Sequence, residues 1–286
     1  MTKAANISEC FALVGHSVIV VGTRRCHFDM ASNARSKYRM PNPKSVRLLR
    51  RAALGCTVAV SFALAGIGTS ASAASDVSAK AAPAHSPSAS IAYKAATGGR
   101  TVALTFDDGP GPATGQILDL LAQYHAQATF CQIGKQAAAN PALVKRIIAD
   151  GHRLCDHTVD HPQPMHTLPH DQQVHEITAA KDMISKAGGP DTRITWFRAP
   201  GGDFSPENRQ IAVQAGLRPL GWTVDTRDWT HPGAASILAT AKRELRPGGI
   251  ILMHDGGGDR SQTVAALRKL LPWLTEQGYR FSLPTS

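Results

Sequence analysis

Residues 102–110 have the sequence V-A-L-T-F-D-D-G-P, and the other predictions build on this segment. An apolar run leads through Thr105 and Phe106 into two adjacent acids, Asp107 and Asp108, and then a Gly-Pro break. Neighbouring side chains alternate along a strand, but at its frayed end two acids can turn into one cleft. Two carboxylates at the end of a buried strand are unfavourable unless something compensates their charge, and a metal ion would do so. The alternative is a surface turn, because Asp, Gly and Pro all favour turns.

Apolar runs of strand length alternate with amphipathic segments along the following chain. The patterns predict helices over 115–127, 141–150, 171–187, 206–215, 234–245 and 262–277, and strands over 128–134, 152–155, 194–197, 217–224, 249–253 and 279–282. This alternation predicts an α/β fold, with parallel strands and outer helices. Ligands bind at the carboxyl ends of such strands, where Asp107, His157, Arg198, Asp225 and His254 all fall.

The positive charge of the chain is concentrated near its beginning. The net charge is +10, but residues 1–98 hold 12 Lys and Arg against 3 Asp and Glu, whereas the remaining residues hold 19 against 18. A basic face on the folded domain is therefore not expected, and nucleic acid is excluded as a predicted partner.

Residues 40–73 have the pattern of a secretory signal peptide. Arginines over 47–51 precede an apolar run over 52–68 and the small-residue stretch 71–74. The run is short for a membrane span, although a retained anchor is the alternative. We expect cleavage after about Ala73, a secreted or cell-wall-associated protein, and no stable membrane anchor.

This prediction divides the chain into four parts. Met40 begins the signal peptide, so residues 1–39 are interpreted as a non-native extension from an upstream start. Residues 74–98 are rich in Ala, Ser, Pro and Lys and are expected to form a disordered linker. Residues 99–286 then form the folded domain, for which no internal repeat is evident.

Two cysteines, Cys131 and Cys155, remain in the expected mature chain, because Cys10, Cys26 and Cys56 fall upstream. An even pair in an exported protein favours a disulfide, which is geometrically possible if the two strands are neighbours. The alternative is a pair of buried free thiols.

His157 and His161 are four residues apart, a spacing that places them on one face of a helix or in one turn of a loop. Two imidazoles and a carboxylate form a three-ligand site with an open position, typical of catalytic zinc, and Asp108 is the natural third ligand. Zn²⁺ is the default divalent ion, but Co²⁺ or another transition ion fits the same donors. The alternative is a pair of ordinary loop histidines.

Five short motifs occur in order at predicted strand ends. They are T-F-D-D-G-P (105–110), H-T-V-D-H-P (157–162), R-A-P-G-G (198–202), D-T-R-D-W (225–229) and L-M-H (252–254). Together they resemble the motifs of the polysaccharide deacetylase family, the NodB-homology domain of carbohydrate esterase family 4. The resemblance covers about residues 100–281 and implies a distorted (β/α) barrel, with metal-dependent removal of acetyl groups from a glycan.

The resemblance also implies roles for individual residues. Asp108, His157 and His161 would hold the metal. Asp107 would be the general base and Arg198 would position it. His254 would be the general acid, tuned by Asp228. The N–H of Gly201 would stabilise the oxyanion, and Trp229 and Leu252 would wall the acetyl pocket.

Two positions depart from the family pattern. Gly201 stands where the family often has an aromatic residue, which puts the sugar subsite in doubt but not the chemistry. Asp156 stands before His157 in place of a commoner Asn, and either orients a ligand or is solvated.

The sequence therefore predicts a monomeric, metal-dependent hydrolase that removes N-acetyl groups from polymers containing N-acetylglucosamine, either chitin oligomers or peptidoglycan. An O-acetyl xylan esterase would need the same site. A glycan-binding protein without turnover is the remaining alternative, because a fold does not by itself fix function.

Overall fold

The computed structural model describes residues 12–14, 17–19, 87–95 and 99–285. Two short strands, β1 (Ala12–Val14) and β2 (Ser17–Ile19), form an antiparallel pair within the predicted extension. The predicted signal peptide, Met40, Cys10, Cys26 and Cys56 lie outside the described residues. Their interpretation therefore stays a prediction.

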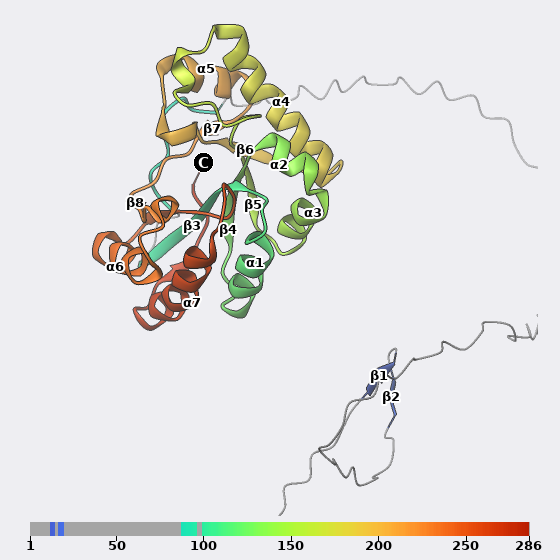
Figure 1. Cartoon of the computed structure of the whole chain (residues 1–286), viewed down its shortest axis with the longest axis vertical. Helices are drawn as coiled ribbons and strands as arrows, with labels where there is room; N and C mark the ends of the chain where they lie inside the picture. The colour runs from blue at the N-terminus through green and yellow to red at the C-terminus, as the bar shows by residue number, and fades with distance from the viewer. Residues whose placement is uncertain (1–11, 15–16, 20–86, 96–98, 286) are drawn as a thin grey trace, which may run out of the picture. The chain divides into compact units, whose positions relative to one another are not determined.

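Residues 99–285 form one sheet of eight parallel strands surrounded by helices. The strand order is β7-β6-β5-β4-β3-β9-β8, with β10 beside β3. Figure 1 shows the helices arranged around the outside of the strands. The sheet curls into a half-barrel, which confirms the predicted distorted barrel. The strands are β3 (Thr101–Gly109), β4 (Ala128–Gln132), β5 (Arg153–Asp156), β6 (Ile194–Phe197), β7 (Arg218–Pro219), β8 (Val224–Asp225), β9 (Gly249–His254) and β10 (Arg280–Phe281).

The helices occupy the predicted segments, with one addition. The predicted ones are α1 (Thr114–Gln123), α3 (Pro141–Ala149), α4 (His170–Gly188), α5 (Pro206–Gln214), α6 (Ala234–Glu244) and α7 (Ser261–Glu276). The additional helix, α2 (Gly134–Ala139), is short and rich in Ala, so it carries no apolar periodicity to predict it. Gly134 allows α2 to approach α4, because a Cβ there would stand 2.9 Å from the Ala180 Cα.

The two faces of the sheet bury different side chains. Along β3, Val102, Leu104 and Phe106 join the large core beneath the helices, whereas Ala103 joins a smaller cluster on the other face. Alternation places Thr105 and Asp107 on the same face as Ala103. The inner face of the half-barrel therefore carries small and polar side chains, and it leads directly to the candidate site.

The predicted strand over 217–224 is wrong, because the chain leaves the ladder between β7 and β8. The carbonyl oxygens of Leu220 and Gly221 accept hydrogen bonds from the Arg198 guanidinium, at 3.0 and 3.1 Å. Pro219 has no N–H to donate. A continuous strand is lost here because the backbone carbonyls hold a buried arginine instead of a neighbouring strand.

The predicted linker is also wrong for residues 87–95, which pack on the domain. Ala92 bridges Leu220 in parallel and Ala95 bridges Pro284 in antiparallel orientation. Both alanines are buried, at 5% and 0% exposure. The low hydrophobicity of this segment hid its contribution, because backbone hydrogen bonds and small buried side chains attach it.

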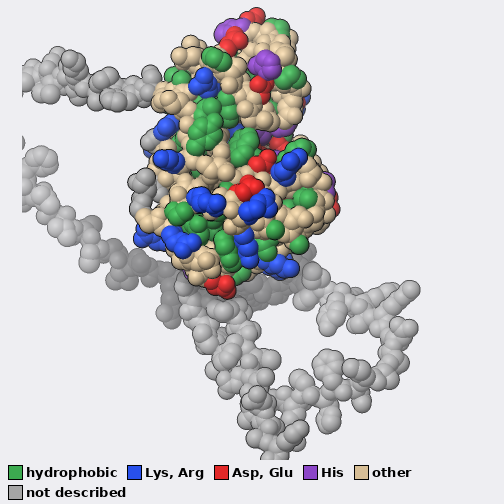
Figure 2. Space-filling model, turned by 90° about the vertical axis from the view of Figure 1, so that its left-hand side faces the viewer, with side chains coloured by type: hydrophobic (Ala, Val, Ile, Leu, Met, Phe, Trp, Pro, Cys, Tyr) green, Lys and Arg blue, Asp and Glu red, His purple; other side chains and the backbone are tan. Residues whose placement is uncertain are grey.

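Among the described residues, none of the helices is both long and apolar enough to span a membrane. Figure 2 shows one face of the molecule, on which basic side chains gather toward the lower half and are interrupted by acidic and apolar ones.

Candidate active site

Asp107 and Asp108 reach the same cleft because the end of β3 is irregular. The register with β4 shifts between Asp107 and Gly109. Asp108 has φ 71°, in the left-handed region that residues other than glycine seldom adopt. This bulge turns Asp108 away from the outward direction that strand alternation would give it. The surface-turn alternative is wrong, since Asp107 is 3% exposed and packs inside the sheet end.

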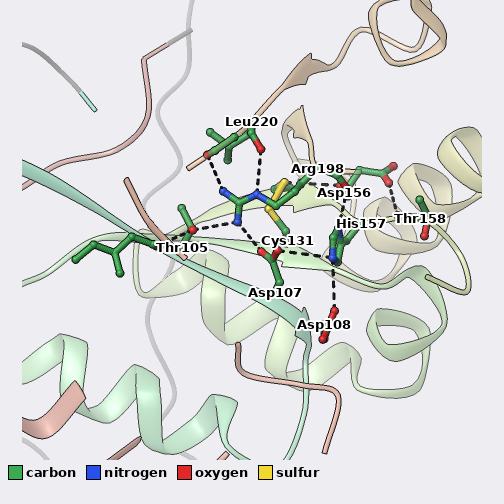
Figure 3. The surroundings of a disulfide bond; sticks show 12 residues. Thr105, Asp107, Asp108, Cys131, Asp156, His157, Thr158, Arg198 and Leu220 are labelled. Carbon is green, nitrogen blue, oxygen red and sulfur yellow. Dashed lines mark hydrogen bonds and ion pairs between the residues drawn. A yellow bond between two sulfur atoms is a disulfide. The ribbon is translucent and has the colours of Figure 1, made fainter. Parts of the chain in front are cut away.

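Arg198, which follows β6, is fully buried beside Asp107. Its Nη1 donates to Asp107 Oδ1 at 2.6 Å and to Thr105 Oγ1 at 3.0 Å. Figure 3 shows the guanidinium between Leu220 on one side and Thr105 and Asp107 on the other. Only Oδ2 of Asp107 remains free of the arginine, and it lies 3.6 Å from His157 Nε2. The pair thus fixes which carboxylate oxygen faces the rest of the site.

Three donors converge next to this pair. Single ligand atoms of Asp108, His157 and His161 all lie within 4.8 Å of one another. Asp108 Oδ1 is 3.5 Å from His157 Nε2 and 3.3 Å from His161 Nε2. This oxygen is buried and has no hydrogen-bond partner within the described residues. Two imidazole nitrogens and an orphaned carboxylate oxygen fit a divalent metal ion.

The two histidines lie in a loop, not a helix. Thr158 and His161 have φ of 67° and 60°, so the segment turns sharply after β5. His157 Nδ1 lies 2.7 Å from the Arg198 carbonyl oxygen, which fixes the ring and leaves Nε2 for the cluster. Burial opposes a charge on His157, but Asp107 and Asp108 outweigh it and raise the pKa of the imidazole. The four-residue spacing of the two histidines therefore corresponds to one turn of a loop.

His254, at the end of β9, is bound twice by Asp228. The two atoms His254 Nδ1 and Asp228 Oδ1 are 2.6 Å apart, and His254 N donates to Asp228 Oδ2 at 2.8 Å. Thr263 Oγ1 donates to the same Oδ2 at 2.7 Å. Burial disfavours a charged imidazole, but the bond and charge of Asp228 dominate and raise the pKa of His254. The arrangement keeps a protonated imidazole available to a higher pH than usual.

One cavity of about 440 Å³ is lined by Asp107, Asp108, His157, His161 and His254, and also by side chains that the sequence did not single out. Gly201, Trp229 and Leu252 line it as predicted. Gln163 and Trp222 line it too, and no motif pointed to either. A Cβ on Gly201 would stand 3.0 Å from Gln163 Nε2, so this amide occupies the space beside the glycine.

The structure joins Cys131 and Cys155 in a disulfide between β4 and β5. Cys155 is followed directly by Asp156 and His157, so the bond anchors the strand that delivers a metal-ligand candidate. Asp156 is fully buried and its Oδ1 accepts from Thr158 N at 2.9 Å, so the solvated interpretation is wrong. Burial raises the pKa of Asp156 to about 8, and a neutral acid is favoured there.

Known proteins resemble this chain along the same domain. A family model described as polysaccharide deacetylase matches residues 94–220. A peptidoglycan-N-acetylglucosamine deacetylase of Bacillus cereus is 39% identical over 204 residues, which cover 68% of this chain and 91% of that protein. A chitooligosaccharide deacetylase of Sinorhizobium fredii is 38% identical over 199 residues, covering 65% and 91%.

A solved structure supports the same relationship. The family 4 carbohydrate esterase from Streptomyces lividans, in complex with acetate, has a TM-score of 0.59 and 33% identity, covering 64% of this chain and 92% of its own. The chain belongs to the polysaccharide deacetylase family. It is therefore a hydrolase of the polysaccharide deacetylase type, and an acetylated glycan is the implied substrate.

Proposed function

We propose that the protein is a secreted, zinc-dependent deacetylase of N-acetylglucosamine polymers, either chitin oligomers or peptidoglycan. The observation that supports this most directly is one cavity that holds a three-donor cluster, a carboxylate beside a buried arginine, and a histidine bound to an aspartate. The two relatives are named for these two substrates, so the choice between them depends on experiment.

Asp108, His157 and His161 would hold the metal ion. When bound, the ion supplies Lewis-acid chemistry, which makes water easier to deprotonate and polarises the acetyl carbonyl. The ligand set favours zinc by default, whereas cobalt or another transition ion uses the same donors.

Asp107 acts as the general base through Oδ2, because Arg198 holds Oδ1. It takes a proton from the attacking water as the oxygen bonds to the acetyl carbon. The Gly201 N–H contributes a donor for the negative charge that develops on the carbonyl oxygen. Trp229 and Leu252 line the cavity, where they would confine the acetyl methyl group.

His254 acts as the general acid. Its Nδ1 is engaged by Asp228, so Nε2 is the atom that can give a proton to the leaving nitrogen. The carbon–nitrogen bond then breaks, and acetate and a free amine are the products. Register pairing places His254 beside Asp107 on the adjoining strand, so acid and base lie at one end of the sheet.

Export is part of the same proposal. The predicted signal peptide motivates it, and a disulfide suits an oxidising compartment. A monomer without a membrane anchor is the expected form. The N-terminal residue of protein recovered from culture medium tests cleavage near Ala73. The N-terminal sequence of the uncleaved precursor tests the start at Met40, and peptides from residues 1–39 would contradict it.

Acetate release provides the test of activity. Chitooligosaccharides, peptidoglycan and acetylated xylan are incubated with the protein, with chelator, and with chelator followed by zinc. Release from an N-acetylated substrate that chelator abolishes and zinc restores supports the proposal. Release from xylan alone favours the esterase alternative. Release from none of the three with zinc present contradicts both and leaves the glycan-binding alternative.

A further inference from the structure

The loop that follows His254 lies directly against the Asp107–Asp108 bulge. Asp255 N and Gly256 N both donate to the Asp107 carbonyl oxygen, at 3.0 and 3.2 Å. A Cβ on Gly256 would overlap the carbonyl group of Asp108. The loop can therefore reach these hydrogen bonds only with a bare glycine backbone at this position.

Gly257 continues the contact toward the carboxylate of Asp108. A Cβ on Gly257 would stand 2.7 Å from Asp108 Oδ2 and 3.0 Å from Arg260 Nη2. The space beside the Gly257 Cα is therefore bordered by both the Asp108 carboxylate and the Arg260 guanidinium, and a methyl group there would meet both. Packing on this side limits where the carboxylate can lie.

The Arg260 side chain forms hydrogen bonds with the backbone of this loop. It is 5% exposed, Nε donates to the Gly256 carbonyl at 2.6 Å, and Nη2 donates to the Gly257 carbonyl at 2.9 Å. One guanidinium therefore fixes two successive peptide units, because its planar group presents several N–H donors in a rigid arrangement. Its burial shows that the side chain is part of the loop's interior support and not a solvated charge.

The bulge needs such support. Asp108 has φ 71°, and residues other than glycine keep this conformation only where their surroundings impose it. On the loop side, the bulge meets backbone groups of residues 255–257 and the Asp255 carboxylate, which lies against Gly109. Arg260 is the side chain that bonds the carbonyl oxygens of residues 256 and 257.

We propose that Arg260 is a positioning residue for the metal ligand Asp108, acting by clamping the glycine loop 256–257 against the bulge. The proposal rests on the metal site of the proposed function. It extends that function to a residue outside the five motifs, in the segment between the general acid and α7.

Zinc affinity of the full chain tests the clamp without relying on turnover. Competition with a chromophoric chelator gives the Kd, and thermal unfolding of the metal-free chain is measured in parallel. Arg260→Ala should raise the Kd about 10- to 100-fold, the usual effect of losing an outer support of a metal ligand. Arg260→Lys should weaken binding less, because an ammonium donates to a carbonyl but lacks the planar fork.

Arg268→Ala is the matched control. It removes the same side chain and charge from α7 at an exposed position, and should leave the Kd within about twofold. A folded Arg260→Ala chain with an unchanged Kd overturns the proposal, whatever its melting temperature, because a merely structural role lowers stability without changing the affinity of the folded chain.

If Arg260→Ala does not fold, two glycine substitutions provide a second test of the proposal. Gly257→Ala and Gly258→Ala each place a side chain at positive φ, 74° and 125°, but only the first meets Asp108, since the second has nothing within 4 Å. Weaker zinc binding confined to Gly257→Ala supports the clamp, and equal Kd values for both variants overturn it. Native zinc affinity without acetate release would instead overturn the proposed function alone, whereas a chain that binds no zinc overturns both.

Discussion

Arg198 Nη1 lies 2.6 Å from Asp107 Oδ1, and both side chains are buried, so the arginine reserves one carboxylate oxygen and leaves the other to the cavity. Removal of one partner of a buried ion pair typically costs about 3–5 kcal/mol, because the remaining charge is left uncompensated. The same arginine offers its carbonyl oxygen to His157 Nδ1. Base and metal ligand are therefore oriented by a single residue.

Asp107→Asn should lower the rate of acetate release by at least about 100-fold, because an amide cannot accept the proton from water. The Asn oxygen can still accept from Arg198, and the three-donor cluster is untouched, so bound zinc should remain stoichiometric. Turnover and zinc content are measured on the same sample. Asp160→Asn is the control, since it removes a carboxylate from the histidine loop but outside the cluster. Near-native turnover of Asp107→Asn would contradict the assignment of the base.

His157→Ala should release the metal. It removes a buried donor from the cluster, so we expect a zinc Kd at least about 100-fold higher and activity lost in proportion. Equilibrium dialysis with metal analysis measures the effect. His175→Ala, an exposed histidine on α4, controls for adventitious zinc binding. Retention of stoichiometric zinc by His157→Ala would show that the ion binds elsewhere.

Asp228→Asn should shift the alkaline limb of the kcat profile to lower pH. The acid works while His254 is protonated, and activity falls as pH rises through its pKa. Asp228 raises that pKa, so loss of the carboxylate charge moves the limb downward. Thr263→Val deletes only a hydrogen bond to Asp228 and should cause a smaller shift. If the alkaline limb of the kcat profile is at the same pH in Asp228→Asn as in the unchanged protein, His254 is not the general acid.

The Cys131–Cys155 disulfide should stabilise the domain by about 3 kcal/mol, given a closed loop of this length. Denaturant unfolding of the two single Cys→Ala variants and of the double variant measures this free energy. Because either single change breaks the bond, each should lose nearly as much stability as the double variant. Additive losses would instead indicate two independent buried thiols.

Gln163→Ala should raise the KM for an N-acetylated oligosaccharide by about 3- to 10-fold and change kcat little, because the amide lines the cavity beside Gly201 and is not one of the proposed proton-transfer groups. Turnover of a small acetyl ester, which needs the chemistry but no sugar contacts, should stay unchanged. A loss of kcat on both substrates would argue against a role confined to binding the sugar.

The alternation of helices and strands was predictable because most elements bury a regular apolar stripe. The exceptions have local causes. The chain between β7 and β8 gives its carbonyls to Arg198, α2 has too few apolar residues to show a period, and residues 87–95 attach through backbone bonds and small side chains. In each case, contacts with residues distant in the sequence determine the local structure, and no periodic pattern in the local sequence predicts it.

For the candidate site, the sequence by itself determined which chemical groups are available and that they follow the ends of parallel strands, because strand periodicity and residue type are local properties. Only the tertiary structure decided how two adjacent acids share one cleft. The left-handed bulge at Asp108 turns its carboxylate toward the histidines, and Arg198 orients Asp107. Gln163, Trp222 and Arg260 stayed hidden in the sequence because their positions depend on segments brought together by folding.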